Sequence, residues 1–137
     1  MPQEKTPQEK MNLLIVDDNK TTAHALGKLL KEDGYEVEIA YDGDMALTMA
    51  QDSKPDAIIL DIALPEKDGY QVARLLREKL LFPALLIALT GYGQREDKIK
   101  AQAAGFDYHL TKPILASEIE ALLKAHGPRV EKEFSLG

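Results

Sequence analysis

Strand-like and helix-like segments alternate five times between residues 12 and 125, and this alternation is the strongest constraint on the fold. Neighbouring parallel strands need a long crossover connection, which is usually a helix. Repeated right-handed strand–helix units give an open, doubly wound α/β sheet with helices on both faces. The predicted strands are residues 12–16, 35–40, 56–60, 84–89 and 106–110.

The pattern of apolar and polar residues in each strand segment predicts where that strand lies in the sheet. The first, third and fourth strand segments are almost continuously apolar, which is typical of strands covered on both faces. Glu36 and Glu38 alternate with apolar residues in the second, which favours an edge strand. Gly34 and Gly105 are expected to end two helices in the left-handed conformation. Apolar residues recur at helical spacing at Ala23, Leu26 and Leu30; Ala46 and Ala50; Val72, Leu76 and Leu80; Ile99 and Ala103; and Leu115, Ile119 and Leu122.

Polar residues stand where the apolar strand segments end. Asp17 and Asp18 follow the first segment, Asp61 the third and Thr90 the fourth, and Lys112 comes shortly after the fifth. Parallel strands bring their carboxyl ends to the same edge of the sheet, which is where ligands bind in such folds. We therefore expect three carboxylates, a hydroxyl and an ammonium group to meet in one small space.

This set of side chains suits the binding of a phosphoryl group. Clustered carboxylates raise one another's pKa unless a cation neutralises them. Oxygen ligands without His or Cys favour a hard cation such as Mg²⁺. An ammonium and a hydroxyl can hold phosphoryl oxygens, and a carboxylate can be the nucleophile. Asp61 is the best candidate for the nucleophile, since it ends the central strand and is followed by the turn residues Pro65 and Asp68-Gly69. Taken singly, each of these residues would be read as a helix cap, a turn residue or a surface charge.

Composition narrows the class of protein. A chain of 137 residues is expected to form one domain. The absence of cysteine excludes disulfides and zinc–thiolate sites, and the net charge of −6 argues against nucleic acid as a partner. The longest uncharged apolar run, residues 80–89, is too short to span a membrane. No secretion signal is recognised, so a cytoplasmic location is expected. Residues 1–10 and 127–137 are expected to be tails, the first of them disordered.

Four motifs together resemble the receiver domains of response regulators in two-component signalling. They are Asp17-Asp18-Asn19, LDIALPEKDG around Asp61, Ala88-Leu89-Thr90-Gly91 and Lys112-Pro113. The resemblance places a receiver domain at residues 11–126. It implies a flavodoxin-like sheet of five parallel strands in the order 2-1-3-4-5 with five helices.

The resemblance also implies a function for the acidic residues. Asp61 would accept a phosphoryl group from the phosphohistidine of a histidine kinase or a phosphotransfer protein. Mg²⁺ would be held by Asp18 directly, by Asp17 largely through water, by Asp61 and by the backbone carbonyl of Ala63. The domain would catalyse only its own phosphorylation and dephosphorylation, and is thus not predicted to be an enzyme acting on other molecules.

The remaining motif residues would transmit the signal. Thr90 and Lys112 match the hydroxyl and ammonium that bind the phosphoryl group, and the Lys112–Pro113 bond matches one that is cis in the family. His109 occupies the position of an aromatic residue that follows Thr90 inward, and both a switching role and a core-filling role remain open. The protein would be a monomer or a weak phosphorylation-dependent dimer with an unknown downstream partner.

Three functions remain open from the sequence. The first is a phosphorylatable receiver, alone or of the type attached to sensor kinases in hybrid proteins. The second is a Mg²⁺-dependent phosphatase of the haloacid dehalogenase type, which would need an acid where Ala63 stands. The third is a receiver-like scaffold that is not phosphorylated. The complete motif set favours the first. Outside the motifs, His24 is expected at the surface. Met45 and Met49 are expected to pack a helix rather than to form a partner site.

Overall fold

The computed structural model describes residues 11–64, 67–80, 83–91 and 95–126, and the two expected tails lie outside them. Within this part of the chain, five parallel strands form one sheet in the order β2-β1-β3-β4-β5. The predicted α/β architecture and strand order are confirmed. The strands are β1 (Asn12–Val16), β2 (Glu36–Ala40), β3 (Ala57–Asp61), β4 (Leu85–Thr90) and β5 (Tyr108–Thr111).

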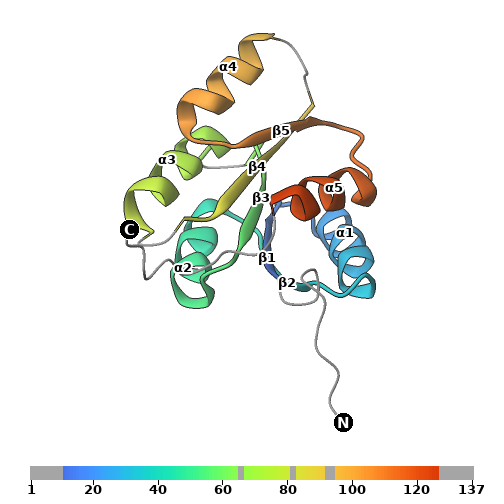
Figure 1. Cartoon of the computed structure of the whole chain (residues 1–137). Coiled ribbons are helices and arrows are strands. Elements are labelled where there is room, and N and C mark those ends of the chain that lie inside the picture. The colour runs from blue at the N-terminus through green and yellow to red at the C-terminus, as the bar shows by residue number, and fades with distance from the viewer. Residues whose placement is uncertain (1–10, 65–66, 81–82, 92–94, 127–137) are drawn as a thin grey trace, which may run out of the picture.

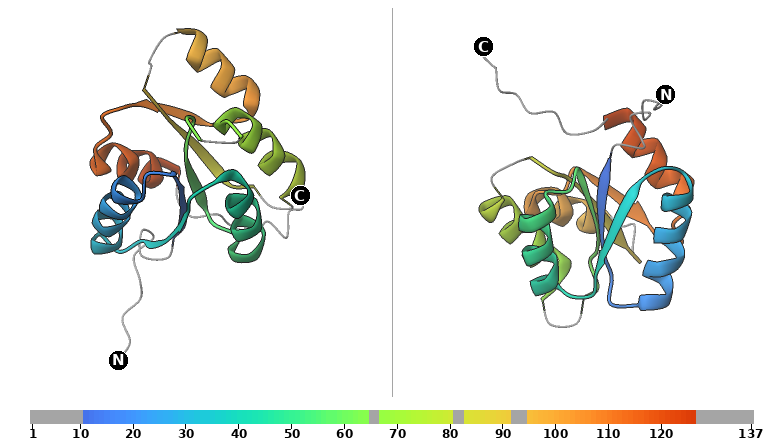
Figure 2. Two further views of the ribbon diagram at one scale, coloured as in Figure 1. Left: turned by 180° about the vertical axis from the view of Figure 1, so that it is seen from behind. Right: turned by 90° about the horizontal axis from the view of Figure 1, so that it is seen from below.

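Five described helices connect the strands and cover both faces of the sheet. α1 and α5 pack side by side on one face, and α2, α3 and α4 cover the other (Figures 1 and 2). The helices are α1 (Lys20–Glu32), α2 (Gly43–Ser53), α3 (Gly69–Lys79), α4 (Arg95–Ala104) and α5 (Ala116–His126). No helix in the described ranges combines the length and apolar character that crossing a membrane requires.

The sheet separates two hydrophobic cores, which explains the continuously apolar strands. In β1, Leu14 and Val16 belong to the core under α2, α3 and α4, whereas Leu13 and Ile15 belong to the core under α1 and α5. Successive side chains of a strand point to opposite faces, so a strand covered on both faces needs an apolar residue at every position. Burying each such side chain contributes about 1.5–3 kcal/mol.

The position of β2 in the sheet is as predicted, whereas β3 and β4 each end one residue later than predicted. β2 lies at the edge, as predicted, with Glu36 and Glu38 exposed. Asp61 and Thr90 are the last residues of β3 and β4, whereas the sequence placed them one position beyond. Asp61 is paired with Leu89 and Thr90 with Thr111, so both polar residues are part of the sheet, and both are buried.

Two predictions of helix faces were wrong. Leu115, predicted on the apolar face of the last helix, precedes α5 and is 63% exposed. α4 presents a face other than the predicted one. The spacing of Ile99 and Ala103 predicted the apolar face of α4, but Ile99 is 58% exposed and Ala103 is exposed as well. Among the residues of α4 whose burial is described, 97–104, Ala101 and Ala104 are the buried ones. α4 packs closely against α3, and its two buried alanines face the core there, so small side chains rather than the large one mark the buried face.

The predicted left-handed helix ends are confirmed. Gly34 and Gly105 have φ angles of 103° and 104°. Gly34 follows Asp33, the C-cap of α1, and its N–H donates to the carbonyl of Lys31. α2 also ends in this conformation, at Lys54 with φ of 51°, and there the sequence carries no glycine to predict it.

A carboxyl pair between α1 and α5 predicts a pH dependence of stability. Hydrogen bonding with Asp33 raises the pKa of Glu120 above its usual 4.5, and burial adds to this. The folded state then binds the proton more tightly than the unfolded state, so this stabilisation is complete below pH 4.5 and is lost as the pH rises through the folded-state pKa. The free energy of unfolding of Glu120→Gln should exceed that of the wild type at pH 7, with the difference shrinking toward pH 4.5.

Urea denaturation at several pH values measures this difference. Glu78→Gln, at an exposed position on α3, is the matched control and should follow the wild type at every pH. A constant difference between Glu120→Gln and the wild type across the range would show that the carboxyl pair does not hold a proton in the folded state.

Candidate functional site

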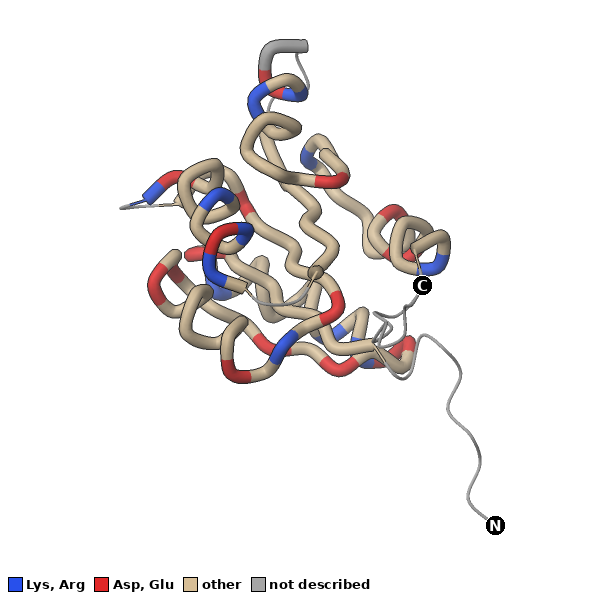
Figure 3. The backbone as a smooth tube through the Cα atoms, turned by 60° about the vertical axis from the view of Figure 1, so that its left-hand side comes forward, with Lys and Arg blue, Asp and Glu red and all other residues tan. Residues whose placement is uncertain are grey.

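Asp61 is a buried carboxylate with both oxygens engaged. The residue is 4% exposed and ends the central strand β3. Its Oδ1 accepts a hydrogen bond of 2.9 Å from the backbone N–H of Ala63, and its Oδ2 accepts one of 2.7 Å from Nζ of Lys112. Asp61 is the only Lys, Arg, Asp or Glu in β1, β3, β4 or β5; the other charged positions lie on the helices, loops and β2 (Figure 3).

Lys112 supplies the positive charge of this pair, and both its side chain and its backbone donate hydrogen bonds to the site. Its ammonium group meets Asp61 across 51 positions of sequence, and its backbone N–H donates to the carbonyl of Thr90 at 2.7 Å. The side chain of Lys112 is 39% exposed and that of Asp61 is 5% exposed. The Lys112–Pro113 bond is cis, as predicted. The ion pair thus joins a buried carboxylate to an ammonium group that water still reaches.

Thr90 lies beside this pair on the same edge of the sheet. It is the last residue of β4 and is 4% exposed. In the β3–β4 register Asp61 faces Leu89, and in the β4–β5 register Thr90 faces Thr111, which precedes Lys112. Three residues predicted from strand ends therefore come from three adjacent strands.

Asp17 adds a second buried carboxylate. It follows β1, is 3% exposed, and its N–H donates to the carbonyl of Ala40 at 3.0 Å. Burial raises the pKa of Asp17, and the nearby charge of Asp61 raises it further, while a hydrogen bond from the N–H of Asn19 at 2.9 Å lowers it. A cation beside Asp17 and Asp61 would relieve their repulsion.

Asp18 differs from its neighbour in being exposed. Among the described residues, no three acidic or histidine side chains converge closely enough to form a ready metal site, so the expected tight group of three carboxylates is not found. Mg²⁺ keeps several waters and takes only one or two carboxylates from a protein. The oxygen-only donor set around Asp17 and Asp61, with Asp18 beside it, fits that mode of binding.

His109 lies at the middle of β5, opposite Ala88 of β4. The residue is half-buried, and its Nε2 is buried without a hydrogen-bond partner among the described residues. A polar atom in this state lacks compensation for its lost hydration. Movement of His109 toward the space around Thr90 stays a prediction.

Sequence reasoning named two residues near the site but missed their structural roles. Asn19 is the N-cap of α1: its side chain accepts from the N–H of Thr22, while its own N–H holds Asp17. An asparagine directly before a helical pattern is the signal that could have found it. The other is Gly69, which the sequence assigned to a turn; it is instead the first residue of α3, directly after the N-cap Asp68.

Gly69 lets α3 approach the end of β3. Its N–H donates to the carbonyl of Ile62 at 2.8 Å. A Cβ atom at this position would lie 2.6 Å from Cα of Ile62 and 2.9 Å from the carbonyl oxygen of Asp61. The close approach of two backbone segments fixes the chain immediately after Asp61.

Comparison with known sequences agrees with this geometry. The sequence profile of the family described as the response regulator receiver domain matches residues 13–124. The alkaline phosphatase synthesis transcriptional regulatory protein PhoP of Bacillus subtilis (strain 168) is 40% identical over 114 residues, which cover 82% of this chain and 47% of that protein. The chain thus spans about half the length of this relative.

Solved structures show the same fold. The receiver domain of the Francisella response regulator 1452 aligns with a TM-score of 0.79 and 28% identity, covering 85% of this chain and 95% of that one. The chemotaxis response regulator CheY4 of Vibrio cholerae aligns with a TM-score of 0.78 and 29% identity, covering 84% and 97%.

Proposed function

Because this chain belongs to the response-regulator receiver domain family, we propose that it accepts a phosphoryl group on Asp61 from the phosphohistidine of a histidine kinase or phosphotransfer protein. The observation that carries the proposal is the pair formed by the buried Asp61 carboxylate and the Lys112 ammonium group at 2.7 Å. A carboxylate at the carboxyl end of the central strand, with a cation beside it, can act as a nucleophile and hold the product.

The proposed step is a transfer between two side chains. A carboxylate oxygen of Asp61 attacks the phosphorus atom, and the O–P bond forms as the P–N bond of the donor breaks. The donor imidazole, protonated on its other nitrogen, leaves as a neutral ring. Lys112 stabilises the charge that gathers on the phosphoryl oxygens. The N–H of Ala63 holds Oδ1 of Asp61 at 2.9 Å and so orients the carboxylate.

Mg²⁺ is the cofactor we propose for this site. Asp17, Asp18, Asp61 and the backbone carbonyl of Ala63 would hold it, and it would neutralise the charge of the incoming phosphoryl group. The support is the pair of buried carboxylates, since burial and the charge of Asp61 raise the pKa of Asp17.

Switching would follow from the new charge. Thr90 would bind a phosphoryl oxygen, and His109, whose Nε2 has no partner among the described residues, would move with it and change the surface around β5. The domain would act on no other molecule, would work in the cytoplasm, and would be a monomer or a weak dimer when phosphorylated. Attachment to a sensor kinase stays a prediction.

The two other functions have less support. A phosphatase of the haloacid dehalogenase type needs an acid at position 63, where an exposed alanine stands. A scaffold that is not phosphorylated needs no paired cation, yet Lys112 meets Asp61 at 2.7 Å.

Phosphorylation by a small-molecule donor tests the proposal. After incubation with acetyl phosphate and Mg²⁺, intact-mass measurement should show one added phosphoryl group on the wild type and none on Asp61→Asn. Asp52→Asn, at an exposed position on α2, is the matched control and should be labelled like the wild type. Removing Mg²⁺ with a chelator should abolish labelling. An equal adduct on Asp61→Asn, or none on the wild type, would refute the proposal.

A further inference from the structure

Arg77, near the end of α3, donates hydrogen bonds to two other segments of the chain. Its Nε donates to the carbonyl of Gly105 at 2.9 Å, and its Nη1 donates to the carbonyl of Ala84 at 2.8 Å. Its Nη2 forms an ion pair of 2.8 Å with Oδ2 of Asp107. The guanidinium group holds its donors in a rigid planar fork, so one side chain reaches several acceptors. Arg77 thus ties the end of α3 to the residue before β4 and to the loop between α4 and β5.

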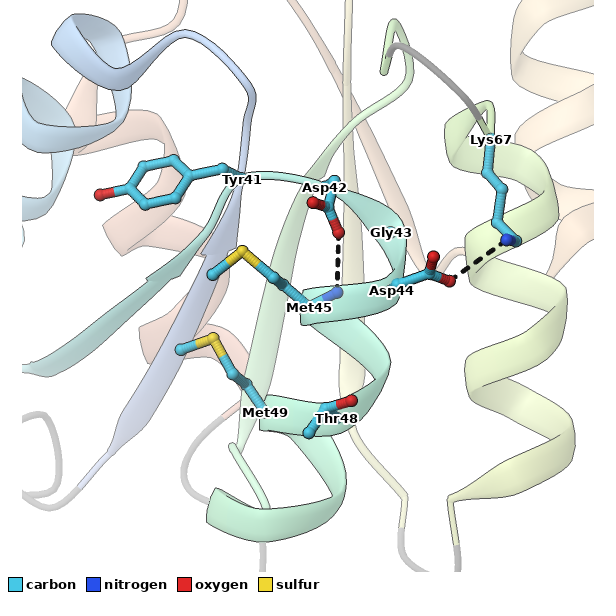
Figure 4. Close-up of a pocket in the computed structure, with 8 residues that line it drawn as sticks. All are labelled: Tyr41, Asp42, Gly43, Asp44, Met45, Thr48, Met49 and Lys67. Carbon is cyan, nitrogen blue, oxygen red and sulfur yellow. Dashed lines mark hydrogen bonds and ion pairs between the residues drawn. The ribbon is translucent and has the colours of Figure 1, made fainter.

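The ion pair in the groove beside α2 is of a weaker kind. This groove has a volume of about 520 Å³ and is lined by the loop after β2, the first turns of α2 and Lys67 (Figure 4). Asp44 meets Lys67 there at 3.2 Å, and surface pairs of this kind contribute little to stability. Met45 lines the same groove and is 37% exposed, so the prediction that it packs the helix is wrong, whereas Met49 packs against the core. Arg77 differs from Lys67 in binding three acceptors at once, two of them backbone carbonyls.

Asp107 joins Arg77 to the sheet at the start of β5. The N–H of Asp107 donates to the carbonyl of Leu86 at 2.8 Å. Its Oδ2, the oxygen that Arg77 binds, also accepts from the N–H of Leu86 at 2.9 Å. Hydrogen bonds with a charged partner are about twice as strong as neutral ones. Arg77 and Asp107 together therefore hold the start of β5 against β4.

β5 has little buried surface of its own to hold it in the sheet. It has four residues, of which the first and last are exposed and the middle two half-buried, and it pairs with β4 alone. All six residues of β4, by contrast, are buried. Burial of apolar surface is the main stabilising contribution in folding. Contacts at the two ends of β5 therefore contribute a larger share of what keeps this strand in place.

Ion pairs stand at both ends of β5. Asp107 directly precedes the strand and pairs with Arg77. Lys112 directly follows it and pairs with Asp61, while its N–H donates to the carbonyl of Thr90. A strand of this length spans only about 13 Å. Rigid secondary elements carry coupling between distant contacts, so the position of Lys112 depends on the contact at the other end of the strand.

We propose that Arg77 is a positioning residue for the phosphoryl transfer. Through Asp107 it holds the start of β5 against β4, and this keeps the Lys112 ammonium group beside Asp61. The inference rests on the proposed function of Asp61 and adds to it a residue at the opposite end of β5. The three acceptors of Arg77 lie outside the acidic site, so its influence on the transfer passes through β5.

Amide hydrogen exchange on the full chain tests the positioning without a phosphoryl donor. Arg77→Met keeps the aliphatic stem and removes every donor. The N–H of Lys112 should then exchange about tenfold faster, as expected for the loss of a hydrogen bond to a charged group. Leu30→Ala, at a fully buried position on α1, lowers the stability of the whole fold and should leave this exchange rate unchanged. An unchanged rate in Arg77→Met, or an equal acceleration by Leu30→Ala, would overturn the proposal.

Labelling by acetyl phosphate tests the effect on the transfer. Arg77→Met should slow labelling about twofold to thirtyfold, the range expected for a residue that acts through a coupled network. Arg74→Met, at an exposed position on the same helix, is the matched control and should be labelled like the wild type. When Lys112→Met is already present, Arg77→Met should cause no further slowing, because the effects of residues that act through one group do not add. Equal slowing with and without Lys112→Met, or no slowing at all, would contradict the proposed role of Arg77.

Asp107→Asn is a second variant that disturbs the fold less. It keeps an acceptor for the N–H of Leu86 and weakens the bond to Arg77, so it should slow labelling in the same direction. Labelling of Asp107→Asn at the wild-type rate would also overturn the proposal. The two proposals fail separately: a wild type that takes no label refutes the proposed function, whereas exchange at Lys112 still decides whether Arg77 holds β5.

Discussion

Lys112→Met is expected to slow the labelling of Asp61 by acetyl phosphate about 100-fold to 1,000-fold, which is the usual cost of removing one donor that stabilises transition-state charge. The Lys112 ammonium already lies 2.7 Å from the carboxylate that would receive the phosphoryl group. Methionine has a similar length and no charge, so the variant removes the cation with little change in packing. The labelling rate is measured from intact mass over time.

The same variant should lose stability. Asp61 keeps the hydrogen bond from Ala63 but remains a buried carboxylate without its cation. Leaving a buried polar group unpaired costs about 1–3 kcal/mol, and the lower end applies because the Lys112 side chain is 39% exposed. Lys98→Met, at an exposed position on α4, is the control and should change neither property. Unchanged labelling in Lys112→Met would remove Lys112 from the proposed mechanism.

Gly69→Ala is expected to destabilise the protein by about 1–3 kcal/mol, which is typical of forcing an extra methyl group into a packed site. In a helix, alanine is favoured over glycine by about 1 kcal/mol, so propensity alone predicts the opposite sign. Overpacking decides the outcome here because the new Cβ would lie 2.6 Å from a backbone atom of Ile62 and 2.9 Å from one of Asp61. Neither backbone segment can move without disturbing the end of β3.

Gly91→Ala is the matched control, since a Cβ atom at Gly91 would meet no atom of the described residues within 4 Å. Urea denaturation should separate the two variants clearly, and Gly69→Ala should also be labelled more slowly by acetyl phosphate because the chain beside Asp61 shifts. A stability for Gly69→Ala at or above that of Gly91→Ala would show that α3 can move away from the end of β3 at little cost.

The fold could be predicted from the sequence because the spacing of apolar residues in each strand is a local property of that segment. Each strand covered on both faces needed an apolar run, and the edge strand β2 showed Glu36 and Glu38 alternating with apolar residues. The buried face of α4 was misread, since the large Ile99 is exposed while Ala101 and Ala104 are buried. Which side of a helix is buried depends on the neighbouring helix, and a single sequence does not reveal that spacing.

The sequence predicted those residues of the site whose positions follow from the ends of the strands. Asp61, Thr90 and Lys112 come together because three adjacent parallel strands end at one edge. The different environments of Asp17 and Asp18 were not predictable, because the loop after β1 buries one and exposes the other. Contacts between loops and helices, such as that of Gly69 with the end of β3, arise from backbone geometry that leaves no periodic pattern.

The two hydrogen bonds of Lys112, from its ammonium group to Asp61 and from its N–H to the carbonyl of Thr90, have a consequence for the dynamics of the domain. Asp61 belongs to the central strand, but the Lys112 ammonium beside it follows β5, which is the edge strand on the other side of the sheet from β2 and the shortest of the five. Segments with few buried contacts open locally at lower free energy than the core. An opening of β5 would break the hydrogen bond from Lys112 to Thr90 and withdraw the ammonium group from Asp61. Under the proposed function, the fraction of molecules ready to accept a phosphoryl group would therefore equal the fraction in which β5 is paired with β4.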